Sequence, residues 1–327
     1  MSRDLKLLQD RLSKFLPSGG EITGITVLSA GNSNESYHVE GLDLVLRLLP
    51  SGEPLIDGHG IVDQFQIQAI IGTLDSAPPV APVRYLCLDN AVLGEPFFLM
   101  QKVEGISFDE YADKSWFTSE ADEYRQNVCR QFVESIAGLA KLPILDALGP
   151  VRTPAEDCAY WRQYALRAAV TELVDLFDEL IARAPMPQGA PSPCHGDAKI
   201  ANTIWKDGKL AAMLDWEMAY NGDPRMDLGY MNYFFVSADT IQTMYGTASG
   251  VWNSEQITAA WEKFTGRRAT DIAWFNAVAA AKIAAITLYG GYLFRHNKTS
   301  NKKMSAWEGN DFRKSIIGVV EERMKRL

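Results

Sequence analysis

A short polar segment near the middle of the chain carries residue types that phosphoryl transfer requires. Asp197 precedes Asn202 by five residues, and Lys199 lies between them. On one tight loop, the carboxylate can face a substrate hydroxyl, the amide can turn towards a metal ion, and the lysine can reach a transferred phosphate. This spacing predicts catalytic roles for Asp197 and Lys199 and a metal-binding role for Asn202. The alternatives are a capping carboxylate and a solvated lysine.

A predicted β-hairpin brings a second carboxylate to Asn202. The apolar segments 203–205 and 211–214 are typical of short strands, and the Asp-Gly pair between them is a strong signal for a tight hairpin turn. The hairpin returns Asp215 to the neighbourhood of Asn202. Amide and carboxylate oxygens are donors that Mg²⁺ accepts together with the oxygens of a nucleotide. Asn202 and Asp215 are therefore the predicted magnesium ligands.

Three motifs in this region resemble those of a known group of enzymes. They follow one another between residues 193 and 228, and they are His195-Gly196-Asp197 with Asn202, Asp215-Trp216-Glu217, and Gly222-Asp223-Pro224 with Asp227-Leu228. In this order they resemble the aminoglycoside phosphotransferase and choline kinase-like branch of the protein-kinase-like fold. The sequence is most similar to the phosphotransferase family that includes the kinase-like part of certain acyl-CoA dehydrogenase fusions. The resemblance covers roughly residues 20 to 300.

The resemblance implies an α+β, two-lobed protein-kinase-like fold. A small β-rich nucleotide-binding lobe would span residues 1–102, and a larger helical lobe with the catalytic loop and acceptor site would span 103–327. The length of 327 residues agrees, because it exceeds the size at which a single hydrophobic core stops growing. The resemblance also implies ATP and Mg²⁺ as cofactors and a hydroxyl of a small molecule as the phosphate acceptor.

The N-terminal part of the chain predicts a hairpin that could cover nucleotide phosphates. A strand over 22–28 is followed by a loop of small polar residues and by strands over 37–39 and 44–47. A lone glycine is weak evidence, so an ordinary hairpin tip is the alternative. Because the family carries a similar loop, the resemblance implies nucleotide contacts for this set: Gly31, Asn32, Ser33 and Asn34.

The third predicted strand ends in a cation. Kinase-like folds place a residue there that contacts the α- and β-phosphates, usually lysine, and Arg47 occupies the matching position. Arginine suits phosphate because it has a permanent charge and a forked donor set. The next predicted helix, over 61–74, has no glutamate to pair with this cation. A contact from Asp63 or a neutral hydrogen bond from a glutamine are the open alternatives, the candidates being Gln64, Gln66 and Gln68.

The resemblance makes residues 101–105 the hinge between the lobes. They follow two further predicted strands, over 84–88 and 97–100. An adenine would bind there through backbone groups, which implies cofactor contacts for Gln101 and Val103. An ordinary linker is the alternative.

Two residues are expected to support the catalytic loop without taking part in the chemistry. His195 is predicted to stabilise the turn that carries Asp197. Asp227 begins an apolar run at a predicted helix N-terminus, where a carboxylate is favourable. By resemblance, it braces the backbone of the catalytic loop. Glu217 is either a second partner of the metal site or a surface residue.

The rest of the chain has helical patterns. Helices are predicted from residues 118–120 to about 142, over 161–182 and over 305–327. The region after residue 228 is rich in aromatic residues, most of which are expected in the core, with a few lining the acceptor pocket. Such a lining fits an apolar or acyl-bearing alcohol better than a polycationic aminoglycoside.

Composition excludes several other classes of protein. The formal charge of -9 argues against binding to nucleic acid or anionic membranes. The four cysteines and four histidines show neither paired nor zinc-binding spacing. The longest apolar segment, 277–294, is interrupted by Lys282 and two glycines, so no membrane span is expected. We expect a soluble cytoplasmic protein with no nucleic-acid or membrane partner.

Two other functions compete with phosphoryl transfer. The missing helix glutamate suggests a nucleotide-binding protein without catalysis. A metal-dependent hydrolase with His195, Asp197 and Asp215 as ligands is the second alternative, although it would leave Asn202 without a role. The residues favour an ATP- and Mg²⁺-dependent phosphotransferase acting on a small-molecule hydroxyl.

Overall fold

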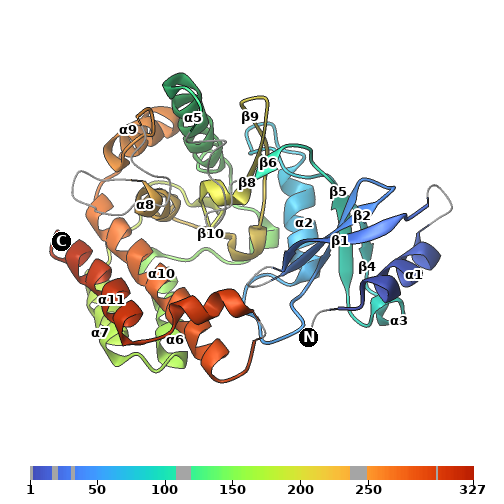
Figure 1. Ribbon diagram of the computed structural model, residues 1–327. Helices are drawn as coiled ribbons and strands as arrows, with labels where there is room; N and C mark the ends of the chain where they lie inside the picture. The colour runs from blue at the N-terminus through green and yellow to red at the C-terminus, as the bar shows by residue number, and fades with distance from the viewer. Residues whose placement is uncertain (1–2, 17–20, 31–33, 108–118, 236–248, 300) are drawn as a thin grey trace.

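The computed structural model describes residues 3–16, 21–30, 34–107, 119–235, 249–299 and 301–327 (Figure 1). These residues form a smaller, β-rich N-terminal lobe and a larger helical lobe. The predicted two-lobed α+β architecture is therefore confirmed. Gly31, Asn32 and Ser33 lie outside the described residues. Their nucleotide contacts stay predictions.

A five-stranded antiparallel sheet forms the N-terminal lobe, with strand order β1-β2-β3-β5-β4. Phe97 and Leu99 of β5 face the core beneath α1, whereas Phe98 between them packs edge-on against Phe65 of α2, with ring centroids 5.9 Å apart. Because successive side chains of a strand point to opposite faces, α1 and α2 cover opposite faces of the sheet. The elements are α1 (Leu5–Phe15), β1 (Gly24–Ala30), β2 (Glu35–Glu40), β3 (Leu44–Leu48), α2 (Ile61–Ile71), β4 (Val83–Cys87), α3 (Asn90–Leu93) and β5 (Phe97–Gln101).

The chain passes into the second lobe after β5. The next strand, β6 (Ile106–Ser107), pairs with β8 (Thr203–Lys206), which pairs in turn with β9 (Lys209–Met213). The division after residue 102 falls in this connection and stays a prediction. The hairpin β8–β9 is confirmed. Its turn residues Asp207 and Gly208 have φ angles of 50° and 71°, as a type I′ turn requires.

Helices packed around α10 form most of the second lobe (Figure 1). By length and apolar composition, α10 is the one described helix that could cross a membrane, but 67% of its apolar window is buried inside the protein. This burial is that of a core helix, which contacts α6, α7, α8 and α11. The helices are α5 (Asp122–Leu139), α6 (Pro154–Arg167), α7 (Thr171–Ala182), α8 (Arg225–Phe234), α9 (Ser254–Thr265), α10 (Ile272–Arg295) and α11 (Asn310–Met324).

Short elements connect these helices. The strands β7 (Ser192–Cys194) and β10 (Tyr220–Gly222) form a two-stranded sheet that no sequence pattern predicted. The short 3₁₀ helices are η1 (Asp146–Leu148), η2 (Ile200–Asn202), η3 (Trp216–Met218) and η4 (Lys302–Trp307). The end of the catalytic loop and the segment after Asp215 therefore form tight turns, η2 and η3.

Three helix predictions were wrong in detail. The predicted helix over 161–182 is two helices, because Ala169 adopts a left-handed conformation with φ of 55° and breaks the hydrogen-bond ladder. The predicted tail helix is likewise divided into η4 and α11 at Gly309, which has φ of 93°. The helix expected to be capped by residues 118–120 begins after Ala121 and has no side-chain cap.

Candidate active site

Asp197 lies in a buried hydrogen-bond network. Its Oδ2 accepts a hydrogen bond of 2.7 Å from the Asn202 amide and lies 3.4 Å from Nζ of Lys199. Its Oδ1 accepts a hydrogen bond of 2.6 Å from the hydroxyl of Tyr230. Burial alone would raise the pKa of Asp197, but the charge of Lys199 and these hydrogen bonds hold it at about 2. The carboxylate is therefore ionised at neutral pH and can accept a hydrogen bond from a hydroxyl.

The hairpin brings the two predicted metal ligands together. The backbone N–H of Leu214 donates to the carbonyl oxygen of Asn202 at 2.8 Å, and Asp215 is the next residue. The amide nitrogen of Asn202 donates to the backbone carbonyl and the carboxylate of Asp197. With its nitrogen bonded to Asp197, the Asn202 side chain would face a metal ion with its amide oxygen. An amide oxygen and a carboxylate are a donor pair that fits Mg²⁺.

Asp215 has an unusual backbone conformation. Its φ of 65° and ψ of 66° lie in the left-handed region, where residues other than glycine are uncommon. Asp tolerates this region better than most residues and also adopts it in turns elsewhere in the chain, such as at Asp207. The conformation turns the chain sharply between β9 and η3 and leaves the carboxylate partly exposed beside the catalytic loop.

Arg47 of β3 contacts this carboxylate from the other lobe. Its Nη2 forms an ion pair with Oδ1 of Asp215, and its Nη1 donates to Oγ of Ser36 at 3.0 Å. Both sequence-based alternatives for its partner were therefore wrong, because the carboxylate facing Arg47 comes from the metal-site motif instead of α2. On α2, Gln64 donates to Asn34 and Gln68 donates to the carbonyl of Ala81. Asp63 and Gln66 are exposed at the surface.

A second hydrogen bond joins the lobes beside this ion pair. The amide nitrogen of Asn34, at the end of the predicted phosphate loop, donates to the carboxylate of Glu217. Gln64 of α2 donates to the amide oxygen of Asn34 at 3.3 Å. Asn34 and Glu217 are both buried, which excludes the surface alternative for Glu217. The motif that carries Asp215 is thus bonded to both β3 and the segment before β2.

His195 and Asp227 lie behind the catalytic loop. The carboxylate of Asp227 accepts the backbone N–H groups of His195 and Gly196 at 2.7 and 2.9 Å. The ring Nδ1 of His195 accepts the N–H of Asp197 at 3.2 Å, and its Nε2 lies 2.9 Å from the carbonyl oxygen of Leu214. These contacts with the main chain fit the predicted supporting roles, which stay predictions.

Gln101 and Val103 lie where β5 leaves the N-terminal lobe. The N–H of Gln101 donates to the carbonyl of Pro82 at 2.8 Å, and its side chain accepts a hydrogen bond from Arg84. Val103 lies in the connection to β6 and is partly buried. The position of this segment between the sheet and the helical lobe agrees with a hinge. Contacts of both residues with an adenine stay predictions.

Two residues of this site were missed in the sequence. Tyr230 belongs to the aromatic-rich region after residue 228, most of which is expected in the core, but its hydroxyl contacts Asp197, 33 residues earlier. Lys282 was noted only as a charge within an apolar segment. Its ammonium donates to the carbonyl of Gly196, 86 residues earlier. Neither residue has a local signal, because the contact depends on how α8 and α10 pack.

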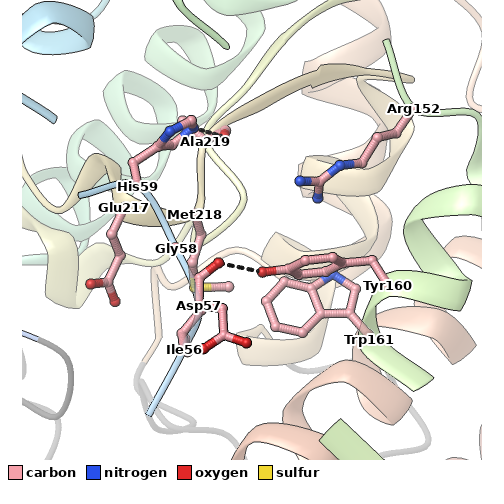
Figure 2. A pocket seen from close by; sticks show the side chains of 10 residues that line it. All are labelled: Ile56, Asp57, Gly58, His59, Arg152, Tyr160, Trp161, Glu217, Met218 and Ala219. Atoms are coloured by element: carbon pink, nitrogen blue, oxygen red, sulfur yellow. Dashed lines mark hydrogen bonds between the residues drawn. The ribbon is translucent and has the colours of Figure 1, made fainter. Parts of the chain in front are cut away.

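A small cavity of about 120 Å³ lies beside the metal-site segment. Figure 2 shows the guanidinium of Arg152 pointing into it, with segment 56–59 on the opposite side. That segment is bonded to the helical lobe, since the hydroxyl of Tyr160 donates to the carbonyl of Asp57 at 2.8 Å and His59 N–H donates to the carbonyl of Glu217 at 2.8 Å. Ligand pockets usually measure about 300–1,000 Å³, so the cavity is too small for a nucleotide.

The metal-dependent hydrolase alternative finds no support in the geometry. Within the described ranges of the chain, no three or more His, Cys, Asp or Glu side chains are grouped so that they could hold a metal ion. His195 directs both ring nitrogens at the main chain. The proposed set of His195, Asp197 and Asp215 is therefore not a metal-binding cluster.

Residues 24–261 match the model of the phosphotransferase enzyme family. The chain belongs to this family. The match covers most of the chain and includes Arg47, the catalytic loop and both predicted metal ligands. The expected family membership is thereby confirmed.

Curated and solved relatives agree with this assignment. Human acyl-CoA dehydrogenase family member 11 is 25% identical over 319 residues, which cover 91% of this phosphotransferase-family chain and 40% of that protein. The chain spans less than half the length of the first curated relatives that it matches, 22% to 41%.

Two solved structures share the fold. A Ralstonia eutropha protein named provisionally as an aminoglycoside phosphotransferase has a TM-score of 0.73 and 20% identity, with 98% of both chains covered. The GDP complex of aminoglycoside 2'-phosphotransferase-IIIa has a TM-score of 0.65 and 15% identity, with 99% of both chains covered. At these identities the similarity shows the kinase-like fold alone.

Proposed function

We propose that this phosphotransferase transfers the γ-phosphoryl group of ATP, bound with Mg²⁺, to a hydroxyl of a small molecule. The observation that carries the proposal is the convergence of four groups from both lobes. Asp197 is hydrogen-bonded to Asn202, whose carbonyl is bonded to the residue before Asp215, and Asp215 is paired with Arg47. Phosphoryl transfer needs an ionised carboxylate that accepts the hydroxyl proton, two oxygen ligands for a metal ion and a cation that binds phosphate.

In the proposed reaction, the acceptor hydroxyl oxygen forms a bond to the γ-phosphorus, and the bond between this phosphorus and the bridging oxygen of ADP breaks. Asp197 orients the hydroxyl and takes its proton as the new bond forms. Lys199 neutralises charge on the transferred group, and Arg47 binds the remaining phosphates. Asn202 and Asp215 would hold Mg²⁺, which supplies charge neutralisation at the phosphate oxygens. Positioning and electrostatics carry such a transfer.

The choice of ATP and of the acceptor is part of the proposal. The GDP complex among the solved relatives supports nucleotide binding in general, and ATP is our choice of donor. The many aromatic residues after residue 228 are our reason to prefer an apolar or acyl-bearing alcohol over a polycationic aminoglycoside as the acceptor. We also expect a cytoplasmic location and no nucleic-acid or membrane partner.

The non-catalytic alternative loses its main support. It was motivated by the missing glutamate on α2, but Arg47 has a carboxylate partner in Asp215. In the structure, Asp215 takes the place of that glutamate as the carboxylate partner of Arg47. ATP binding with no transfer to any acceptor would be the signature of this alternative.

Phosphorus NMR of Mg·ATP with a metabolite extract tests the proposal. We expect a new phosphoester signal with the wild-type protein and none with Asp197→Asn, which keeps the shape of the side chain but removes its charge. Asp178→Asn is the matched control, because Asp178 is a surface carboxylate paired with Arg162. Equal signals for all three proteins would remove Asp197 from the reaction. No signal with extracts from several sources, despite tight ATP binding, would favour the non-catalytic alternative.

A further inference from the structure

Lys282 of α10 is a buried lysine that reaches the catalytic loop. Its side chain lies in the core of the helical lobe, and the residue is 4% exposed. Its ammonium donates to the carbonyl oxygen of Gly196, the residue before Asp197. A buried ammonium is costly unless other groups compensate for the lost water. This lysine is therefore held in the core by specific contacts.

Aromatic rings and a carboxylate supply the compensation. The ammonium lies 4.3 Å from the ring centroid of Trp161 and 4.6 Å from that of Tyr230, within the range of cation–π attraction. The indole N–H of Trp161 donates to Asp157 at 3.2 Å, and the buried Asp157 carboxylate stabilises the positive charge of Lys282. Burial lowers the pKa of Lys282, whereas Asp157, Asp197 and Asp227 counteract this effect.

Two opposite charges hold Gly196 from its two sides. Its N–H donates to Asp227 at 2.9 Å, and its carbonyl accepts from Lys282. Gly196 has a φ of 79°, and a Cβ atom there would lie 2.1 Å from the carbonyl oxygen of Met218, so the turn requires glycine. Asp227 and Lys282 together fix the peptide groups on both sides of this turn. They thereby set the direction in which Asp197 leaves the loop.

Tyr230 provides a second connection between Lys282 and Asp197. Its ring faces the ammonium, and its hydroxyl donates to Oδ1 of Asp197. Lys282 thus acts on Asp197 through the preceding carbonyl and through a ring that contacts the carboxylate. Both routes end at the group that would orient the acceptor hydroxyl.

We propose that Lys282 is a positioning residue that holds Asp197 at the angle required for phosphoryl transfer. The proposal rests on the proposed function. Lys282 contacts the loop backbone and two rings, so it acts through Asp197 and is not itself a catalytic residue. Its loss should impair the transfer step more than nucleotide binding, because Lys282 contacts the Gly196 carbonyl and two rings, whereas Arg47 and Asp215 pair with each other.

Kinetics of Lys282→Met provide the first test, because methionine keeps the length of the side chain but removes the charge and the donor. We expect kcat to fall about tenfold or more, since small misplacements of reacting groups are expensive, while KM for ATP stays within about threefold. Tyr230→Phe should also lower kcat. The fold decrease in kcat of the double variant should be smaller than the product of the two single fold decreases, because both substitutions disturb the same carboxylate.

The control variant is Leu293→Ala, a fully buried residue of the same helix. Leu293 lies eleven residues further along α10, roughly 16 Å away at the usual helical rise. This substitution should lower the melting temperature without a comparable loss of kcat. A kcat loss in Lys282→Met that is no larger than that of Leu293→Ala would reduce Lys282 to a residue of general stability.

Hydrogen exchange measured without substrate separates this proposal from the proposed function. In Lys282→Met, the amides of residues 195–203 should exchange about tenfold faster, while those of α10 stay protected. If wild type transfers no phosphate, the proposed function fails, yet the exchange result still decides whether Lys282 orders the loop. Unchanged exchange in this segment overturns the proposal. If Lys282→Met does not fold, Lys282→Gln is subjected to the same measurements with the same expectations.

Discussion

Arg47 and Asp215 form an ion pair between the two lobes, at the point where nucleotide phosphates and a metal ion are expected to bind. The carboxylate of Asp215 neutralises the arginine that would bind phosphate, and Arg47 neutralises the carboxylate that would bind the metal ion. Both side chains are partly accessible, with 12% and 31% of their surface exposed. Under the proposed function, Mg·ATP replaces the pair, with Arg47 turning to phosphate and Asp215 to the metal ion.

Arg47→Ala should weaken ATP binding at least several-fold, because the variant lacks the cation proposed to contact the α- and β-phosphates. Titration calorimetry with Mg·ATP measures the change. Arg11→Ala, which removes an exposed arginine from α1, is the matched control. Unchanged affinity in Arg47→Ala would exclude Arg47 from the nucleotide site.

Asp215→Asn should reduce turnover by about 100-fold or more, because the amide is a poorer ligand for a divalent cation. The reduction should be partly relieved as the Mg²⁺ concentration is raised, since weaker binding is overcome by mass action. Turnover measured over a range of Mg²⁺ concentrations checks this, with Asp178→Asn as the control. A variant as active as wild type at low Mg²⁺ would refute the metal assignment.

The contribution of Asp197 to stability should depend on pH in a defined window. Its pKa is depressed to about 2 in the folded protein, so the ionised form stabilises the fold by roughly 2–3 kcal/mol. This contribution is fully present above the unfolded pKa of about 4 and is lost as the pH falls towards 2. The difference in free energy of unfolding between wild type and Asp197→Asn should therefore stay constant from pH 8 to 5 and shrink below about 4. Urea unfolding at each pH measures it, and a difference that already changes at neutral pH would contradict the low pKa.

Gly196→Ala should destabilise the protein by more than about 1 kcal/mol and abolish most activity, since the left-handed turn and the nearby carbonyl of Met218 leave no room for a side chain. Gly318→Ala is the contrasting control. A Cβ atom at Gly318 in α11 would meet open space, so alanine should be neutral or stabilise the helix by about 0.5–1 kcal/mol. Thermal unfolding of both variants makes the comparison. Equal melting temperatures would show that the turn at Gly196 can relax.

Local spacing determined much of the site in advance. Asn202 follows Asp197 by five positions, and the tight turn η2 brings the two side chains into a direct hydrogen bond. The Asp-Gly turn sets the β8–β9 hairpin and so brings Asp215 to Asn202. The same holds for the strands of the N-terminal sheet, whose apolar patterns predicted their positions within a few residues. The turns, the hairpin and the strands depend on residues close together in the sequence, so residue types and their spacing predict them.

Only the tertiary structure decided which distant groups meet. Arg47 and Asp215 lie 168 residues apart, and Lys282 lies 86 residues from Gly196. Their contacts depend on how the sheet and α10 pack against the catalytic loop, which no interval in the sequence encodes. The helical pattern of apolar residues over 161–182 continues through Ala169, yet the helix breaks there. Packing of α6 and α7 against α10 outweighs the local preference for one helix. The sequence by itself thus determined the chemistry and the local turns, whereas packing over long distances selected the partners that orient them.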